Sequence, residues 1–122
     1  MANPVVHFEI FGKNRETLRS FYTDAFGWEF GEPAGPNDYM LVTTGGEGAI
    51  GGGMGVSPDQ THPGHVTFYI SVPDVGKALE TVAQHGGTIV MGPDLVPGGP
   101  VIGMFRDPEG HFIGLAALAP QA

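Results

Sequence analysis

The stretch Val5-Val6-His7-Phe8-Glu9-Ile10-Phe11 decides the fold, because its pattern returns sixty residues later as Val66-Thr67-Phe68-Tyr69-Ile70. Every second residue of the first stretch, beginning at Val6, is apolar and reappears at the same offset in the second. Side chains at alternate positions of a strand share one face. Each stretch therefore predicts a strand with one apolar face, and the repeat predicts two similar modules that pair around one core.

An amphipathic helix is expected after each of these strands. Apolar residues recur at i, i+3, i+4, i+7 and i+8, which is the helical period. They are Leu18, Phe21, Tyr22, Ala25 and Phe26 in the first helix and Val75, Ala78, Leu79, Val82 and Ala83 in the second. Asn14 and Asp74 are the expected N-caps. Gly27 and the pair Gly86-Gly87 are the expected ends of the helices.

Three short strands are expected after each helix, so the predicted order is βαβββ twice. The predicted strands cover residues 4–11, 28–30, 39–44 and 49–56 in the first module and 65–72, 88–91, 101–106 and 111–118 in the second. Most connections are too short for parallel crossovers. We therefore expect one α+β domain over residues 1–122. Module one (1–57) and module two (64–122) pair into a curved mixed sheet with the helices outside and an inner cup.

Composition excludes several classes of function. The formal charge of −8 argues against nucleic acid or an anionic membrane as a partner, since both require a basic face. The chain has no Cys, so disulfides and thiolate metal sites are excluded. No apolar run approaches the roughly 18 residues of a membrane span, and no signal peptide is visible at the start. A cytoplasmic location is expected.

The second face of each leading strand is polar and aromatic. It carries His7, Glu9 and Phe11 in the first strand, and His65, Thr67 and Tyr69 in the second. Phe11 and Tyr69 would be unusual on a freely solvated face. We expect this face to line the cup and hold a small molecule. The alternative is that it meets solvent or a partner chain.

The chain resembles the vicinal oxygen chelate superfamily, which includes glyoxalase I, bleomycin-resistance proteins and extradiol dioxygenases. The resemblance covers nearly the whole chain. More narrowly, the chain is similar to small glyoxalase-like proteins. It rests on His7–Ile10, Phe21–Trp28, Ile50–Met54, Val72–Val75, Gly86-Gly87, Asp107–His111 and Gly114-Leu115.

In metal-using members, the resemblance implies four ligands, one from the first and one from the last strand of each module. His7 occupies the first of these positions and Thr67 the equivalent one in module two. Aligning Glu47–Gly52 with Glu109–Gly114 puts Gly52 and Gly114 at the other two. Glycine has no side chain to ligate a metal. We therefore expect no metal cofactor, with a divalent metal held by His7, Glu9 and His65 as the alternative.

Three functions remain open from the sequence. The first is a metal-free protein that binds a small organic molecule, with a lining of Phe11, Tyr39, Gly52, Met54, His65, Thr67, Tyr69, Phe112 and Gly114 around His7 and Glu9. A lyase-like enzyme would use His7 and Glu9 as an acid–base pair. The alternative is a metal-dependent glyoxalase or dioxygenase. The resemblance also implies a homodimer, and the sheet face could instead be a dimer contact.

Overall fold

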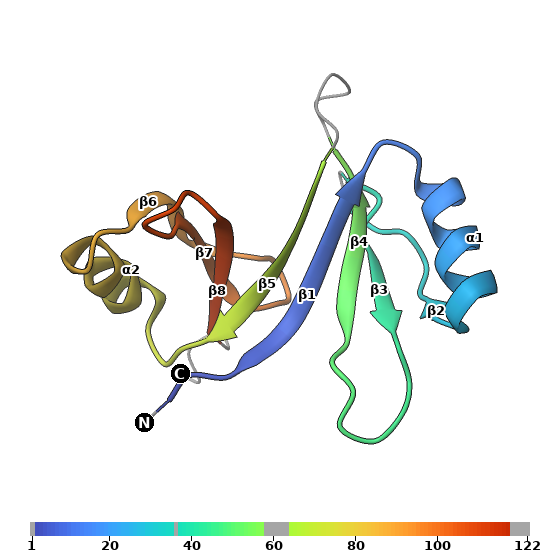
Figure 1. The fold of residues 1–122 in the computed structure, drawn as a ribbon, viewed down its shortest axis with the longest axis horizontal. Helices are drawn as coiled ribbons and strands as arrows, with labels where there is room; N and C mark the ends of the chain where they lie inside the picture. Colours follow the sequence, from blue (N-terminus) through green and yellow to red (C-terminus); the bar gives the residue numbers. More distant parts are fainter. Residues whose placement is uncertain (1, 36, 58–63, 118–122) are drawn as a thin grey trace. The chain divides into compact units, whose positions relative to one another are not determined.

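The computed structural model describes residues 2–35, 37–57 and 64–117, and it has the predicted element order (Figure 1). The elements are β1 (Val5–Gly12), α1 (Arg15–Phe26), β2 (Glu29–Phe30), β3 (Met40–Thr43), β4 (Gly52–Val56), β5 (His65–Ser71), α2 (Val75–Gln84), β6 (Thr88–Leu95), β7 (Val101–Arg106) and β8 (Phe112–Ala117). This is βαβββ twice, so the predicted α+β class is confirmed. Contacts divide the chain into two compact units. We call His7–Thr67 the first unit, and the residues before His7 together with those from Phe68 onward the second unit.

In the first unit the strands lie in the order β2-β3-β4-β1. β1 pairs with β4 in parallel, and the other pairs are antiparallel, so the sheet is mixed as predicted. The Asn14 side chain caps α1 by accepting the Thr17 N–H at 3.0 Å. The helix ends at Gly27, whose φ of 73° is the left-handed conformation that glycine adopts readily. The core of this unit is Ile10, Met40, Val42 and Met54.

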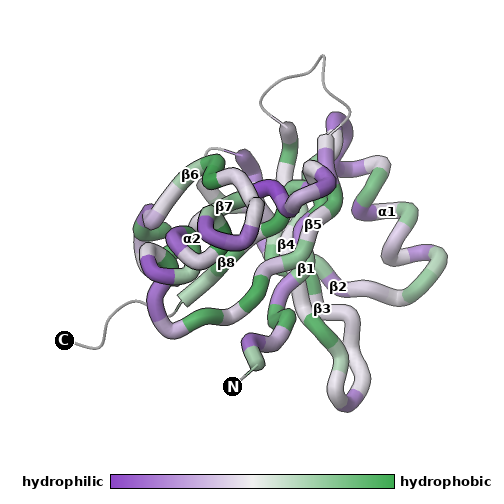
Figure 2. The backbone as a smooth tube through the Cα atoms, turned by 60° about the vertical axis from the view of Figure 1, so that its left-hand side comes forward, coloured by the Kyte–Doolittle hydropathy of each residue, from purple (hydrophilic) through white to green (hydrophobic). Residues whose placement is uncertain are grey.

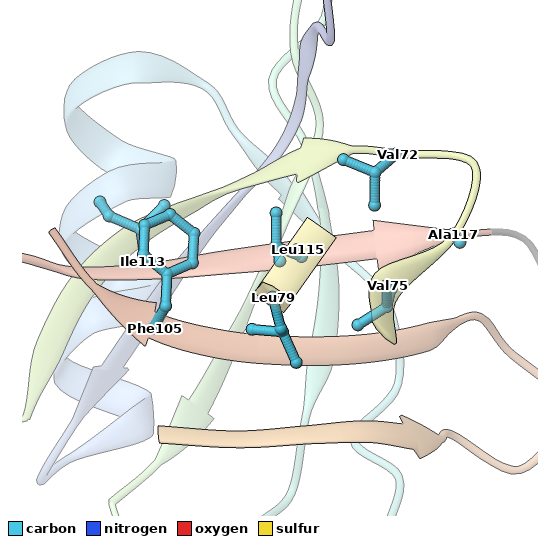
Figure 3. Packing of buried hydrophobic residues seen from close by; sticks show 7 residues of the cluster. All are labelled: Val72, Val75, Leu79, Phe105, Ile113, Leu115 and Ala117. Atoms are coloured by element: carbon cyan, nitrogen blue, oxygen red, sulfur yellow. The ribbon is translucent and has the colours of Figure 1, made fainter. Parts of the chain in front are cut away.

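The second unit repeats this plan, with the order β5-β8-β7-β6 and a parallel β5–β8 pair. Asp74 caps α2 by accepting the Lys77 N–H at 3.0 Å. Figure 3 shows the apolar cluster between α2 and its strands, made of Val72, Val75, Leu79, Phe105, Ile113, Leu115 and Ala117. Val75 and Leu79 of the predicted helical stripe therefore belong to the core of this unit, and Ala78 and Val82 pack against it.

Two sequence-based boundaries were wrong. The loop predicted from Gly92 is strand, because β6 continues to Leu95 and pairs Leu95 with Val101. Register shifts between Ile89 and Asp94 accommodate the Gly92-Pro93 pair within the strand. The strand predicted from residue 49 begins only at Gly52. The predicted stop of α2 is confirmed, since Gly86 follows the C-cap His85 with a left-handed φ of 96°. Most of the predicted link between the modules (58–63) lies outside the described residues.

The apolar face of each leading strand is only partly buried. Phe8 and Ile10 pack with Leu18 of α1, and Ile70 and Val72 pack on the α2 side, as predicted. Val66, in contrast, is 74% exposed. It lies at the start of β5, whereas the cluster on α2 forms around the end of that strand. The predicted apolar face of β5 is therefore not buried along its whole length.

Candidate functional site

A buried carboxylate is the centre of the candidate site. Glu9 is only 8% exposed, and both of its carboxylate oxygens accept hydrogen bonds. The Tyr39 hydroxyl donates to Oε1 at 3.3 Å, and His65 Nε2 lies 3.1 Å from Oε2. His7 Nε2 lies 2.9 Å from the same Tyr39 hydroxyl. We call His7, Glu9, Tyr39 and His65 the Glu9 cluster, and all four belong to the first unit.

These contacts fix where the protons lie. A tyrosine hydroxyl has one proton to donate. Because Tyr39 donates it to Glu9, its oxygen accepts from His7, so His7 carries a proton on Nε2. His65 likewise carries a proton on Nε2, which it donates to the carboxylate. The resulting array runs from His7 through Tyr39 and Glu9 to His65.

Strand geometry and one tight loop bring the cluster together. The alternation of β1 puts His7 and Glu9 on one face, opposite Phe8 and Ile10. Tyr39 is held by a two-way backbone bridge with Ala34, with N···O distances of 2.9 and 3.0 Å. Asp38, immediately before it, has a φ of 51°, which is uncommon for a residue other than glycine. The backbone therefore fixes the position from which the Tyr39 side chain extends.

Gly53 makes room for Tyr39. A Cβ built on Gly53 would overlap the hydroxyl end of the Tyr39 ring. Gly53 is also the partner of Glu9 in the β1–β4 pair. Gly53 belongs to the Ile50–Met54 stretch of the resemblance, but it was not predicted as a site residue. The absence of a side chain at this position allows Tyr39 to reach Glu9.

The strand register corrects the internal alignment by one residue. Glu9 pairs with Gly53, and Tyr69 pairs with Gly114. Gly53 is therefore the counterpart of Gly114, not Gly52 as the sequence alignment had it. A Cβ on Gly52 would meet the Phe8 ring at 2.6 Å, on the α1 side of the sheet. The inference that β4 supplies no ligand side chain is unchanged, because Gly53 is also a glycine.

Met54 was placed wrongly for the same reason. It is fully buried and packs with Ile10, Met40 and Val42 in the core of the first unit. Met54 therefore lies on the opposite face of β4 from the Glu9 cluster and does not line it. The same holds for Gly52, which pairs with Phe8.

Phe11 adds an aromatic wall to the cluster. Its ring stacks on His65 with centroids 5.1 Å apart and planes at 9°, and it lies 6.1 Å from the Tyr39 ring. This agrees with the prediction that Phe11, Tyr39 and His65 share a face. Thr67, from the same unit, is also buried.

The remaining predicted site residues belong to the second unit. Tyr69 is buried, and a Cβ on Gly114 would meet its ring. Phe112 lies under the Arg106 guanidinium, 5.2 Å from the ring centroid. Residues 112 and 114 alternate with Ile113 and Leu115 of the apolar cluster, so they occupy the opposite face of β8. This agrees with the face predicted for them.

Burial changes the titration of His7. It lowers the pKa of this imidazole below its usual value of 6.5, and the nearby charge of Glu9 partly opposes the shift. His7 is therefore neutral at pH 7. A neutral imidazole can accept a proton, whereas an imidazolium cannot.

His85 and His111 lie at a helix end and in a turn, away from the Glu9 cluster, and His62 lies outside the described residues. His111 Nδ1 lies 2.9 Å from Asp107 Oδ2, and Asp107 also accepts the backbone N–H groups of Glu109 and His111. These hydrogen bonds, chiefly from the His111 backbone, lower the pKa of Asp107. His85 is the C-cap of α2.

The cluster does not fit a metal ion as it stands. Across the described ranges, no three His, Asp or Glu side chains are grouped so as to hold one. The Tyr39 hydroxyl lies between His7 and Glu9, and both oxygens of Glu9 are engaged.

In the part of the chain that the structure describes, no helix is long and apolar enough to cross a membrane.

Comparison with known proteins agrees with this fold. A glyoxylase-like domain-containing protein from Didymella fabae is 29% identical over an alignment that covers 84% of each chain. Methylmalonyl-CoA epimerase from Mycobacterium tuberculosis superposes with a TM-score of 0.74 at 15% identity, covering 96% of this chain and 89% of the epimerase. A hypothetical protein from Bacillus halodurans gives a TM-score of 0.75 at 13% identity, covering 100% of this chain and 99% of the other.

The sequence profile of one superfamily matches residues 5–115, which is most of the chain. The protein belongs to the Glyoxalase/Bleomycin resistance protein/Dioxygenase superfamily.

Proposed function

We propose that this protein binds a small, partly aromatic organic molecule at the Glu9 cluster, through hydrogen bonds and aromatic contact rather than through a metal ion. The observation that carries the proposal is the pairing of a buried, fully engaged carboxylate with an aromatic wall. Glu9 is bonded by Tyr39 and His65, and the Phe11 ring stacks on His65. A few fixed polar groups beside flat apolar surface are typical of small-molecule sites.

The charge of the cluster restricts the ligand. A buried carboxylate disfavours an anionic ligand nearby, because like charges repel strongly where little water screens them. His7 is neutral, so it does not offset the charge of Glu9. We therefore expect a neutral or cationic ligand with an aromatic ring, such as a phenol, catechol or aromatic amine.

A reaction is the second candidate, and the state of His7 favours it. Its lowered pKa keeps it neutral at pH 7, and its Nε2 proton is held by Tyr39. In this lyase-like function His7 would take a proton from a carbonyl substrate. Transfer of the Nε2 proton to Tyr39, and of the hydroxyl proton to Glu9, would then leave the proton on the carboxylate. The metal-dependent glyoxalase or dioxygenase reaction would require Tyr39 to leave its place between His7 and Glu9.

The first test is metal content followed by ligand screening. Protein without a His-tag, from cells supplied with zinc, iron, nickel and manganese, is analysed for bound metal. About one equivalent of metal, lost in His7→Ala, would refute the metal-free proposal. Phenols, catechols, aromatic amines and aldehydes are then screened by thermal shift and confirmed by calorimetry.

The variants Tyr39→Phe and Tyr22→Phe separate site effects from general ones. Each removes one hydroxyl from the first unit, but Tyr22 lies on α1 and stacks on Trp28. Any ligand of the Glu9 cluster should bind more weakly to Tyr39→Phe and equally well to Tyr22→Phe. Equal binding to both variants, or no binding of any neutral or cationic aromatic compound, would contradict the proposal. Sedimentation of the same protein tests the expected homodimer.

A further inference from the structure

A hollow lies in the first unit, on the α1 side of β1. It has a volume of about 690 Å³ and is lined by Ile10, Phe11, Gly12, Lys13, Asn14, Thr17, Leu18, Tyr22, Gly64, His65 and Val66. Ile10 points to the α1 side, whereas Glu9 points to the other face of the strand. We call this hollow the α1 groove. Phe11 and His65 are the residues that it shares with the surroundings of the Glu9 cluster.

The floor of the α1 groove is apolar. Leu18 and Tyr22 of α1 face Ile10 of β1, and Val66 adds a side chain that is 74% exposed. No residue of α1 is fully buried, although Figure 2 shows hydrophobic residues along this helix. Covering this apolar surface would remove it from water, which is favourable by roughly 25 cal/mol for each Å². The floor therefore suits an apolar chain.

One cationic side chain, Lys13, lines the groove in an acidic protein. The chain has a formal charge of −8 and five Lys and Arg residues; Lys13 precedes α1, and Arg15 and Arg19 lie on α1 outside the groove lining. Arg15 pairs with Glu16 and Asp38, and Arg19 lies 3.9 Å from Glu16. Lys13 is exposed, lines the groove, and has no ion pair among the described residues. An anionic group on a ligand would meet it there.

We propose that the α1 groove binds an amphipathic carboxylate, such as a medium-chain fatty acid. The carboxylate pairs with Lys13, and the alkyl chain covers Ile10, Leu18 and Val66. This ligand is opposite in charge preference to the one proposed for the Glu9 cluster. The two sites share Phe11 and His65 as lining residues, but they lie on opposite faces of β1. The α1 groove does not depend on the function assigned to that cluster.

The protein contains its own reporter for the groove. Trp28 is the only tryptophan, and its ring stacks on Tyr22 with centroids 4.7 Å apart and planes at 10°. Tyr22 lines the groove. Decanoate, kept below its micelle concentration, is titrated while Trp28 emission is followed, and calorimetry gives the affinity. Decyltrimethylammonium has an alkyl tail of about the same length and the opposite charge, so it tests which sign of charge the groove prefers.

Three variants test the two parts of the site. Lys13→Gln should weaken decanoate binding about two- to fivefold, the range of an exposed ion pair, whereas the control Lys77→Gln on α2 should not. Val66→Asn should weaken the binding of decanoate without unfolding the protein, because Val66 is mostly exposed. Tyr39→Phe should leave decanoate binding unchanged, because Tyr39 belongs to the Glu9 cluster.

Each opposite result overturns the proposal. These results are the absence of saturable decanoate binding, equal affinity for decyltrimethylammonium, and unchanged binding in Lys13→Gln or Val66→Asn. Weakened binding in Tyr39→Phe would assign decanoate to the Glu9 cluster instead. If the wild-type protein sediments as a dimer, Val66→Asn as a monomer, and decanoate binds to neither, a second copy of the chain covers the groove.

Discussion

Replacing Gly53 by alanine should displace Tyr39 from the Glu9 cluster. The added Cβ would overlap the hydroxyl end of the Tyr39 ring, which is the mobile end of that side chain. The backbone of β4 is paired on both sides, with Glu9 of β1 and Leu41 of β3. We therefore expect the ring to move and the strand to stay.

The cost follows from the contacts that Tyr39 loses. Its hydroxyl bonds the charged Glu9 at 3.3 Å and His7 at 2.9 Å. A bond to a charged group contributes about 1.5–3 kcal/mol and a neutral one about 0.5–1.5 kcal/mol, and the first is long, so the lower end applies. We expect Gly53→Ala to lower the free energy of unfolding by about 2 kcal/mol. In a domain of this size, that is a fall of roughly 8 °C in Tm.

A double-mutant cycle with Tyr39→Ala isolates the cause. In the Tyr39→Ala background the ring is absent, so Gly53→Ala should cost less than about 0.5 kcal/mol, and the two changes should couple by about 2 kcal/mol. Urea unfolding of all four proteins measures this coupling. Gly51→Ala is the control, since its Cβ would lie 3.3 Å from the Val42 carbonyl and no closer to any other group. Equal costs of Gly53→Ala in both backgrounds would refute the reasoning.

Four further predictions concern the titration of His7, the pH dependence of stability, a turn and the core. Glu9→Gln should lower the pKa of His7 further, since it removes the charge that opposes burial; NMR titration of the imidazole should show no upward shift. Burial holds the pKa of His7 in the folded protein below 6.5, so as the pH falls this imidazole takes up a proton more readily in the unfolded chain. The contribution of His7 to the free energy of unfolding should therefore be complete above about pH 6.5 and decrease at lower pH. Asp107→Ala should lower Tm by removing three hydrogen bonds of its turn, and an unchanged Tm would show that the turn forms without them. Met54→Ala should cost about 2–5 kcal/mol in urea unfolding, whereas Leu41→Ala, at a 66% exposed position, should cost little; similar costs would contradict the assignment of Met54 to the core.

The ends of the helices were predictable from the sequence. The caps Asn14 and Asp74 and the stop at Gly27 lie where the residue types predicted them. Such features depend on neighbours along the chain. The repeat of alternate apolar residues in β1 and β5 likewise predicted the element order.

Register and burial were less predictable, because both depend on residues far apart in the sequence. The alignment assigned Gly52 rather than Gly53 to the face of Glu9, and a shift of one residue along a strand moves every side chain to the other face. The same shift misplaced Met54. The bridging role of Tyr39 depends on the left-handed Asp38 and on the space at Gly53, which only the folded strands reveal.

The parallel pairing of β1 with β4 has a consequence for the order of folding. The β3–β4 hairpin pairs Met40 with Met54 across a short loop, whereas the β1–β4 pair joins Phe8 to Gly52 across most of the first unit. Closing the longer loop costs more chain entropy, so we expect it to follow the hairpin. Glu9 meets Tyr39 only after this step. Pulsed hydrogen exchange should therefore find the amides of the β3–β4 hairpin protected before those of β1. The hydrogen bonds of the Glu9 cluster would be the last part of the first unit to form.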